Sequence, residues 1–162
     1  NYLNMKTAFE FGGGYGGMAM LIHRLGFTGV YVIFDFPEFN LLQKYYLKSH
    51  GIEVSMEPTT KSCVVLLSSF EMLHRQFEMM KHIDIYIATW SLSESSLSVR
   101  SHITNIMPSC KHWLIAYQHV FEGIDNVVYF DTLMKNHPEI QWQKSAIVHL
   151  PNQYYLFGYD KN

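Results

Sequence analysis

Cysteine is scarce in this sequence, with only Cys63 and Cys110 among 162 residues. The two lie far apart along the chain and each adjoins an apolar run. We therefore expect two buried, reduced thiols and not a disulfide or a metal pair. The nine histidines are scattered without a pair at zinc-ligand spacing, so we expect no metal site.

An excess of positive charge is also absent. The formal net charge is −2 and the sequence pI is about 6.5, which is not the basic footprint of a nucleic-acid-binding domain. The sequence has neither an apolar run long enough to cross a bilayer nor a signal peptide. We expect a cytoplasmic protein without nucleic-acid or membrane partners, although a local patch leaves some modified RNAs open as substrates. Composition does not indicate an oligomeric state.

Apolar residues are plentiful: hydrophobic residues make up 48% of the chain and aromatic residues 15%. A chain of this length and composition is typical of one domain with a single core, here residues 1–162. No repeat, linker or low-complexity segment interrupts it. Because the chain begins at Asn1 and a strand follows almost at once, we expect that residues upstream of Asn1 are missing.

The most informative stretch runs from Thr7 to Gly17. An apolar run carrying Glu10 is followed by five glycines within six positions, and then by a helical pattern that Gly26 ends. A strand, a glycine-rich turn and a helix in this order open the nucleotide site of many parallel sheets. Glycine at these positions permits positive φ and lets a ligand approach the backbone.

Two ligand classes fit this stretch. Gly12-x-Gly14-x-x-Gly17 matches a dinucleotide fingerprint, whereas Glu10-x-Gly12-x-Gly14-x-Gly16 resembles the first motif of S-adenosylmethionine-dependent methyltransferases. A pyrophosphate beside Glu10 would meet like charge, while the ammonium and sulfonium of S-adenosylmethionine would meet opposite charge. The acid therefore favours the second ligand.

A second acid follows the next strand. Asp35 ends the apolar run Val30–Phe34 about 20 residues after the glycines, where a carboxylate commonly binds ribose hydroxyls. The alternative role for Asp35 is to cap the helix that Pro37 begins. Phe36 stacks on adenine in one interpretation and belongs to the core in the other.

The remaining pattern alternates buried strands with helices, which predicts an α/β, Rossmann-like, doubly wound sheet with helices on both faces. In the helix from Glu38 to His50 we expect the buried face to comprise Phe39, Leu42, Tyr45, Tyr46 and Leu47. Residues 54–61 are expected to be irregular. Strands are expected near Thr7–Phe11, Val30–Phe34, Val64–Leu67, Ile83–Ala88 and Trp113–Tyr117, followed by an antiparallel hairpin from Ile140 to Tyr159.

The whole chain resembles the class I methyltransferase core. The blocks Glu10–Gly17, Tyr31–Glu38 and Trp90–Glu94 further resemble bacterial sugar O-methyltransferases. The resemblance implies a seven-stranded sheet whose last strand is antiparallel. It also implies S-adenosylmethionine as cofactor and a small-molecule methyl acceptor, either a sugar or another hydroxyl-bearing molecule.

The resemblance also implies roles for individual residues along the carboxyl ends of the strands. Ser68 and Ser69 have helix capping as their alternative role. The implied cofactor-binding residues are Glu10, Gly12, Gly13, Gly14, Tyr15 and Gly16 for the methionine and ribose part, Asp35 for the ribose diol, Ser68, Ser69 and Phe70 near adenine, and Ala88, Thr89, Trp90 and Ser91 under the sulfonium.

Two residues are candidates for the base that takes a proton from a hydroxyl acceptor. Glu94 and His119 follow the fourth and fifth strands, and His119 is the better base on chemistry because histidine titrates near neutrality. The alternatives are a helix-stabilising carboxylate at Glu94 and an exposed loop histidine at 119. Trp90 either walls the acceptor pocket or belongs to the core.

Three functions remain open from the sequence. The first, which we favour, is a small-molecule O-methyltransferase. The second is a catalytically silent methyltransferase-like domain that serves as a binding module. The third is a nicotinamide-dependent oxidoreductase, which Glu10 and the terminal hairpin oppose.

Overall fold

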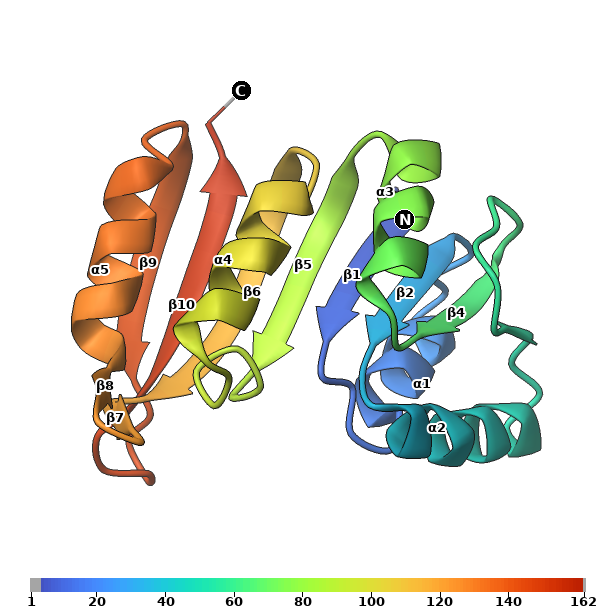
Figure 1. The fold of residues 1–162 in the computed structure, drawn as a ribbon, viewed down its shortest axis with the longest axis horizontal. Helices are drawn as coiled ribbons and strands as arrows, with labels where there is room; N and C mark the ends of the chain where they lie inside the picture. Colours follow the sequence, from blue (N-terminus) through green and yellow to red (C-terminus); the bar gives the residue numbers. More distant parts are fainter. Residues whose placement is uncertain (1–3, 162) are drawn as a thin grey trace.

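The computed structural model describes residues 4–161, which form one main sheet flanked by helices (Figure 1). The strands and helices lie close to where the alternating pattern predicts them. The strands of the main sheet are β1 (Thr7–Phe11), β2 (Val30–Phe34), β3 (Val54–Ser55), β4 (Cys63–Leu67), β5 (Ile83–Thr89), β6 (Cys110–Gln118), β9 (Ile140–Ala146) and β10 (Gln153–Asp160). The helices are α1 (Gly17–Arg24), α2 (Pro37–Ser49), α3 (Phe70–Met80), α4 (Leu97–Ile106) and α5 (Asn126–Asn136).

The strand order is β3-β4-β2-β1-β5-β6-β10-β9. Neighbours from β3 to β6 are parallel, and β10 is antiparallel to both β6 and β9. β1 lies at the centre, where Ala8 pairs with Tyr31 of β2 and with Ile85 of β5. The expected mostly parallel sheet with a C-terminal antiparallel hairpin is confirmed.

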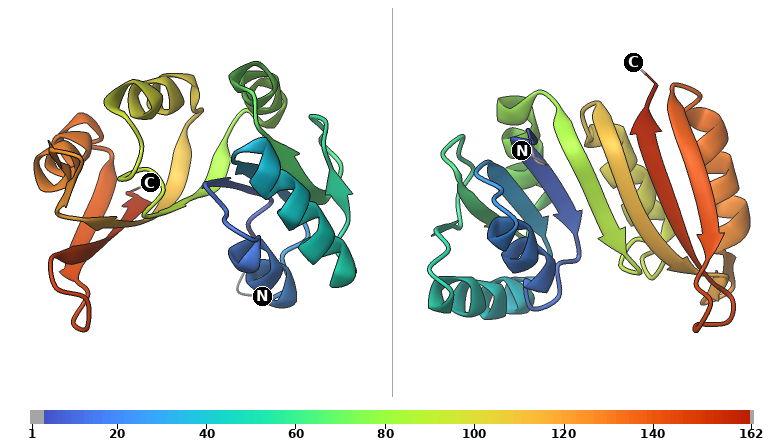
Figure 2. Two further views of the ribbon diagram at one scale, coloured as in Figure 1. Left: turned by 60° about the horizontal axis from the view of Figure 1, so that its bottom comes forward. Right: turned by 180° about the vertical axis from the view of Figure 1, so that it is seen from behind.

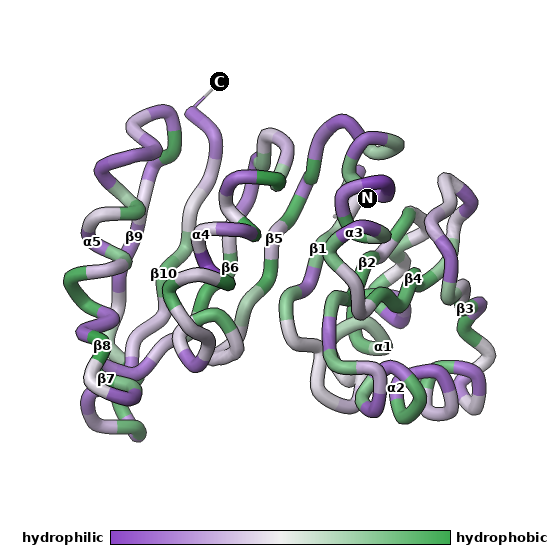
Figure 3. The backbone as a smooth tube through the Cα atoms, viewed as in Figure 1, coloured by the Kyte–Doolittle hydropathy of each residue, from purple (hydrophilic) through white to green (hydrophobic). Residues whose placement is uncertain are grey.

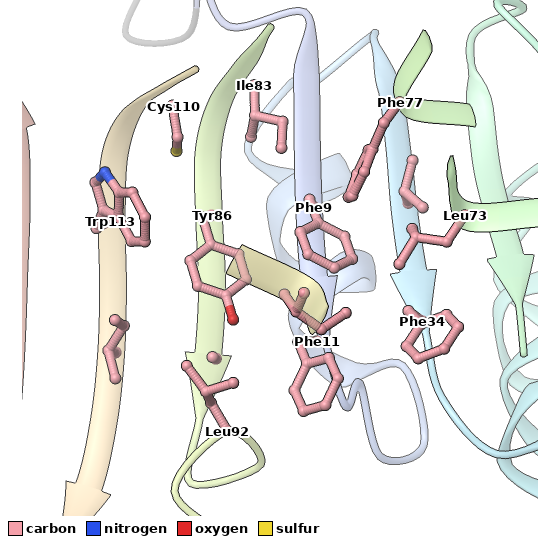
Figure 4. Close-up of a cluster of buried hydrophobic side chains, with 14 of the residues drawn as sticks. Phe9, Phe11, Phe34, Leu73, Phe77, Ile83, Tyr86, Leu92, Cys110 and Trp113 are labelled. Atoms are coloured by element: carbon pink, nitrogen blue, oxygen red, sulfur yellow. The ribbon is translucent and has the colours of Figure 1, made fainter. Parts of the chain in front are cut away.

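Helices cover both faces of the sheet, with α1 and α2 on one face and α3, α4 and α5 on the other (Figure 2). The alternation along β1 explains why: Ala8 packs with the α1 and α2 side, and Phe9 packs with the opposite side. Figure 4 shows the larger cluster, in which Phe9 lies between Phe77 and Tyr86. Burial on both faces gives the continuous apolar runs of the central strands.

The expected count of seven strands is wrong, because the main sheet has eight. The additional strand is β3, where Val54 pairs with Val64 and Ser55 with Val65. This segment was expected to be irregular. A two-residue edge strand has no periodicity to detect, so its pairing depends on the neighbouring strand and not on its own sequence.

The apolar spacing from Ile124 to Asn136 predicts a helix over these residues, but the helix begins two residues later. Ile124–Asp125 forms β8, which pairs with β7 (Val120–Phe121), and Asp125 then caps α5 by accepting a hydrogen bond from the Val128 amide at 3.1 Å. The segment after β6 is therefore a small hairpin before the helix.

The expected buried face of α2 is confirmed at Leu47 and in part at Tyr46, which packs against the core, and is wrong at Phe39, Leu42 and Tyr45. The helix buries Asn40, Gln43 and Leu47, while Tyr45 is 77% exposed. The contacts of Gln43 with the glycine-rich loop fix this rotation of the helix.

The two cysteines are free and buried, as expected. Across residues 4–161 no helix is long and apolar enough to cross a membrane. Within the same residues, no group of three His, Cys, Asp or Glu side chains is placed to hold a metal ion.

Candidate functional site

A cavity of about 620 Å³ lies at the carboxyl ends of β1, β2 and β5. The chain leaves β1 toward β2 on one side and later returns to β5 on the other, which is the switch point where open α/β sheets bind ligands. Its lining residues are Phe11, Gly12, Gly14, Phe34, Asp35, Phe36, Phe39, Phe70, Thr89, Trp90, Ser91, Glu94, Ser95, Ser96 and Val99.

The backbone of the glycine-rich loop adopts positive φ values, which residues with a side chain rarely adopt. Gly12, Gly14 and Gly16 have φ of 72°, 56° and 95°. A Cβ on Gly12 would lie 2.4 Å from Cβ of Ser91, whereas a Cβ on Gly14 would meet nothing within 4 Å. Gly14 therefore presents bare backbone to the cavity, as the sequence predicts.

Asp35 lies beside this loop. Its Oδ2 accepts hydrogen bonds from the Gly14 amide at 3.2 Å and from Gln43 Nε2 at 2.9 Å, and its Oδ1 accepts from the Phe36 amide at 2.9 Å. The residue at the start of α2 is Phe36, which makes no side-chain cap, so the capping role considered for Asp35 is wrong. Burial raises the pKa of the Asp35 carboxyl, and these hydrogen bonds oppose the rise.

Sequence reasoning missed Gln43, which is fully buried in α2. Its Nε2 donates to the Gly14 carbonyl at 2.8 Å as well as to Asp35, so one side chain joins the loop, the acid and the helix. The available signal was a glutamine four residues before Leu47, on the same helix face.

Glu10 does not line the cavity. Alternation along β1 turns it to the α1 and α2 side, where Tyr31 Oη donates to its Oε2 at 2.9 Å and only 2% of the residue is exposed. A Cβ on Gly13 would lie 3.2 Å from this oxygen, so the loop covers the carboxyl. Burial raises the pKa of Glu10 to about 7, against the lowering effect of the Tyr31 hydrogen bond, and Asp35 adds to the rise.

Other loop residues predicted to bind cofactor also lie outside the lining. Gly16 precedes the first turn of α1, and Tyr15 is 57% exposed with its ring edge-on to Tyr46 at 5.0 Å. The roles assigned to Gly13, Tyr15 and Gly16 stay predictions.

Aromatic rings line the part of the cavity where the resemblance places adenine. Phe36 is 70% exposed and lines the cavity, so its alternative as a core residue is wrong. Phe70 also lines it, with its ring 5.0 Å from that of Phe34. Ser69 instead caps α3 by accepting from the Met72 amide at 3.2 Å, and neither Ser68 nor Ser69 lines the cavity.

The segment after β5 forms the opposite wall. Trp90 adopts a φ of 65°, which is rare for a bulky residue, and its amide donates to the Ala116 carbonyl at 2.7 Å. Ser91 Oγ donates to the Phe11 carbonyl and ties this wall to β1. Thr89, Trp90 and Ser91 line the cavity as predicted, whereas Ala88 is buried beneath it.

The two candidate bases are placed differently. Glu94 lines the cavity, and Gln118 Nε2 donates to its Oε1 at 3.4 Å. His119 is outside the lining, half-exposed, with its Nε2 3.8 Å from a carboxylate oxygen of Asp125. The position in the cavity therefore favours Glu94 as the base, although histidine is the better base on chemistry.

A buried arginine that sequence reasoning missed supports the Glu94 segment. Arg100 has no exposed surface and donates to the carbonyls of Ser93 at 2.7 Å and Ser95 at 3.0 Å, and to Asn126 Oδ1 at 2.7 Å. Its guanidinium lies 4.6 Å from the ring centre of Tyr129. No sequence motif predicts this arrangement of Arg100 with Ser93, Ser95, Asn126 and Tyr129.

No family model and no curated protein matches the sequence. The structure is similar to an O-methyltransferase family protein from Burkholderia thailandensis, with 13% identity and a TM-score of 0.67 over 97% of this chain and 51% of that one. It is similar to M. capricolum TrmK in complex with S-adenosylhomocysteine, with 11% identity and a TM-score of 0.67 over 98% of this chain and 63% of that one.

A third similar structure is an rRNA methylase from Streptococcus thermophilus, with 12% identity and a TM-score of 0.65 over 99% of this chain and 90% of that one. The chain thus spans about half the length of the first of these proteins. Identities this low establish architecture and not activity or acceptor. The chain has the α/β fold that these three methyltransferases share.

Proposed function

We propose that this protein binds S-adenosylmethionine in the cavity and transfers its methyl group to a small hydroxyl-bearing acceptor. The observation that carries the proposal is the open backbone of Gly14 held beside the Asp35 carboxylate at the switch point of the sheet. The cavity of about 620 Å³ is within the usual range for sites that hold a small molecule.

The lining residues fit the parts of this cofactor. Asp35 accepts hydrogen bonds from the ribose hydroxyls, since a carboxylate has acceptor capacity beyond the three bonds it makes. Phe36 and Phe70 offer aromatic surfaces to adenine. The loop around Gly14 approaches the methionine part. When bound, the cofactor supplies a methyl group on a sulfonium.

Catalysis by such a site depends mainly on alignment of the acceptor with the methyl group. We propose that Trp90 and the neighbouring wall orient the acceptor and that Glu94 takes the proton of its hydroxyl. The contact of Glu94 with Gln118 supports its orientation. His119 is the alternative base if the segment after β6 moves toward the cavity.

A sugar is the acceptor that the sequence resemblance favours, and the indole face of Trp90 in the cavity wall is compatible with stacking on a sugar ring. An RNA acceptor is the alternative, because one protein of similar fold is an rRNA methylase. A methyl-transfer assay on both acceptor classes distinguishes them.

Thermal shift with three ligands tests the cofactor directly. At a concentration of about 100 Kd, a ligand stabilises the fold by about 2.7 kcal/mol, which raises the Tm of a protein of this size by roughly 5–10 °C. We expect S-adenosylmethionine and S-adenosylhomocysteine to raise the Tm and NAD to leave it unchanged.

A rise with NAD alone would overturn the proposal in favour of an oxidoreductase. A Tm that none of the three ligands changes would favour the silent binding module.

A further inference from the structure

Helix α2 carries its polar and apolar residues on unexpected sides. The core side holds Asn40 and Gln43 beside Leu47, whereas Leu41 is 63% and Tyr45 is 77% exposed. A surface helix ordinarily places its apolar residues toward the core. Figure 3 shows hydrophobic residues interspersed with hydrophilic ones along this helix. Large apolar residues exposed together on one element mark an interaction surface.

Four exposed residues form one row on the outer side of α2. Glu38, Leu41, Tyr45 and Lys48 are spaced by three, four and three positions, which keeps them on one face of a helix. A shallow, open depression in this surface is lined by Leu41, Lys44, Tyr45, Lys48 and Ser49.

The row is self-complementary. Read from either end, a charged residue is followed by two apolar residues and then by a charge of opposite sign. If a second helix of the same sequence lies antiparallel across it, with the two-fold axis at the level of residue 43, Glu38 faces Lys48 of the other copy at both ends. Leu41 then faces Tyr45 of the other copy twice.

We propose that this protein forms a symmetric dimer through an antiparallel pair of α2 helices, one from each copy. Charge complementarity selects a second copy as the occupant of this face, because an unrelated apolar partner gains nothing from the acid and base at opposite ends of the row. The inference does not depend on the proposed function.

The row is separate from the part of α2 that lines the cavity. Phe36 and Phe39, at the beginning of α2, line the cavity and remain 70% and 43% exposed in the single chain. Counted around the helix, these two residues lie on a different side of α2 from the row, so the antiparallel pair does not cover the cavity wall. One helix pair buries less surface than a typical stable dimer, so we expect a dissociation constant of about 10–100 µM.

Sedimentation velocity from about 1 to 500 µM tests the proposal, with charge reversal as the probe. Glu38→Lys and Lys48→Glu each place like charges together at both ends of the pair, and each should weaken dimerisation at least about tenfold. The double variant Glu38→Lys/Lys48→Glu restores opposite charges and should regain the wild-type dissociation constant. Glu57→Lys, an equal charge change in an exposed loop, is the matched control and should have no effect.

Tyr45→Ala removes the central apolar contact and should also weaken the dimer, while Leu21→Ala, on the exposed side of α1, should not. Far-UV circular dichroism establishes that each variant is folded. A wild-type chain that stays monomeric up to about 500 µM would overturn the proposal. So would a dimer that tolerates both single reversals, or a double variant as weak as either single one.

Discussion

Glu10 belongs to the motif that the sequence indicates, but its contacts differ from those we expected. The sequence indicates an acid before the glycines, and we expected it to face a cationic ligand group. The structure turns it to the other side of β1, against Tyr31 and beneath Gly13. The period of two along a strand says that Glu10 and Phe11 face opposite sides, but not which side holds the ligand.

The buried Glu10 carboxyl should make stability depend on pH. Its folded pKa is raised from 4.5 to about 7, so the folded state holds a proton that the unfolded state releases between these values. The stability is therefore fully present below about pH 4.5 and is lost as the pH rises toward 7, by up to about 3 kcal/mol. Urea unfolding across this range should show wild type losing stability relative to Glu10→Gln.

The difference between these two proteins isolates Glu10 from other titrating groups. Glu57→Gln, which removes an exposed carboxyl, is the control and should track wild type. A constant gap between wild type and Glu10→Gln from pH 4.5 to 8 would show that the carboxyl is not buried as described.

The positions of Asp35 and Phe36 at the cavity were predictable because their sequence signals are local. In this topology, an acid at the end of a buried strand about 20 residues after a glycine-rich turn lies at the carboxyl edge of the sheet, next to that turn. Gln43 was not predictable in the same way. Its role depends on the rotation of α2, which tertiary contacts with Gly14 and Asp35 decide.

Among the elements, strands with long apolar runs were predicted best. β1 and β2 begin and end where the sequence places them, because burial on both faces makes most of their residues apolar. α2 was predicted in extent but not in orientation, since hydrophobic periodicity assumes that apolar residues turn inward. β3 is too short to show any periodicity.

α4 and the segment before it depend on Arg100. Replacement by methionine removes the three hydrogen bonds that Arg100 donates to Ser93, Ser95 and Asn126. Buried acceptors left without donors are costly, so we expect Arg100→Met to destabilise the fold by about 2–4 kcal/mol in urea unfolding.

Arg75→Met, on the exposed side of α3, provides the comparison and should change stability by less than about 0.5 kcal/mol. Equal effects of the two substitutions would contradict the supporting role of Arg100.

For the whole molecule, the parallel strands and the antiparallel terminal hairpin followed from the alternation of strands and helices, whereas the strand order and the place of β10 between β6 and β9 were not predicted. The full lining of the cavity could not be predicted from the sequence, because it comes from the ends of several strands and the beginnings of α2 and α4. The turns that bring these strand ends and helix beginnings together have a positive φ at Gly12, Gly14 and Trp90. The sequence predicts a positive φ only at the two glycines.

The central claim is that Asp35 and the glycine-rich loop bind S-adenosylmethionine. Calorimetric titration of S-adenosylhomocysteine into wild type, Asp35→Asn and Asp131→Asn tests it most directly. Asp131 is a half-exposed acid on α5, so its variant controls for the loss of one charge. We expect saturable binding to wild type and Asp131→Asn, and binding weaker by one to two orders of magnitude for Asp35→Asn, because charge-assisted hydrogen bonds worth about 1.5–3 kcal/mol are lost. Equal affinity in all three folded proteins, or no binding to wild type, would contradict the account.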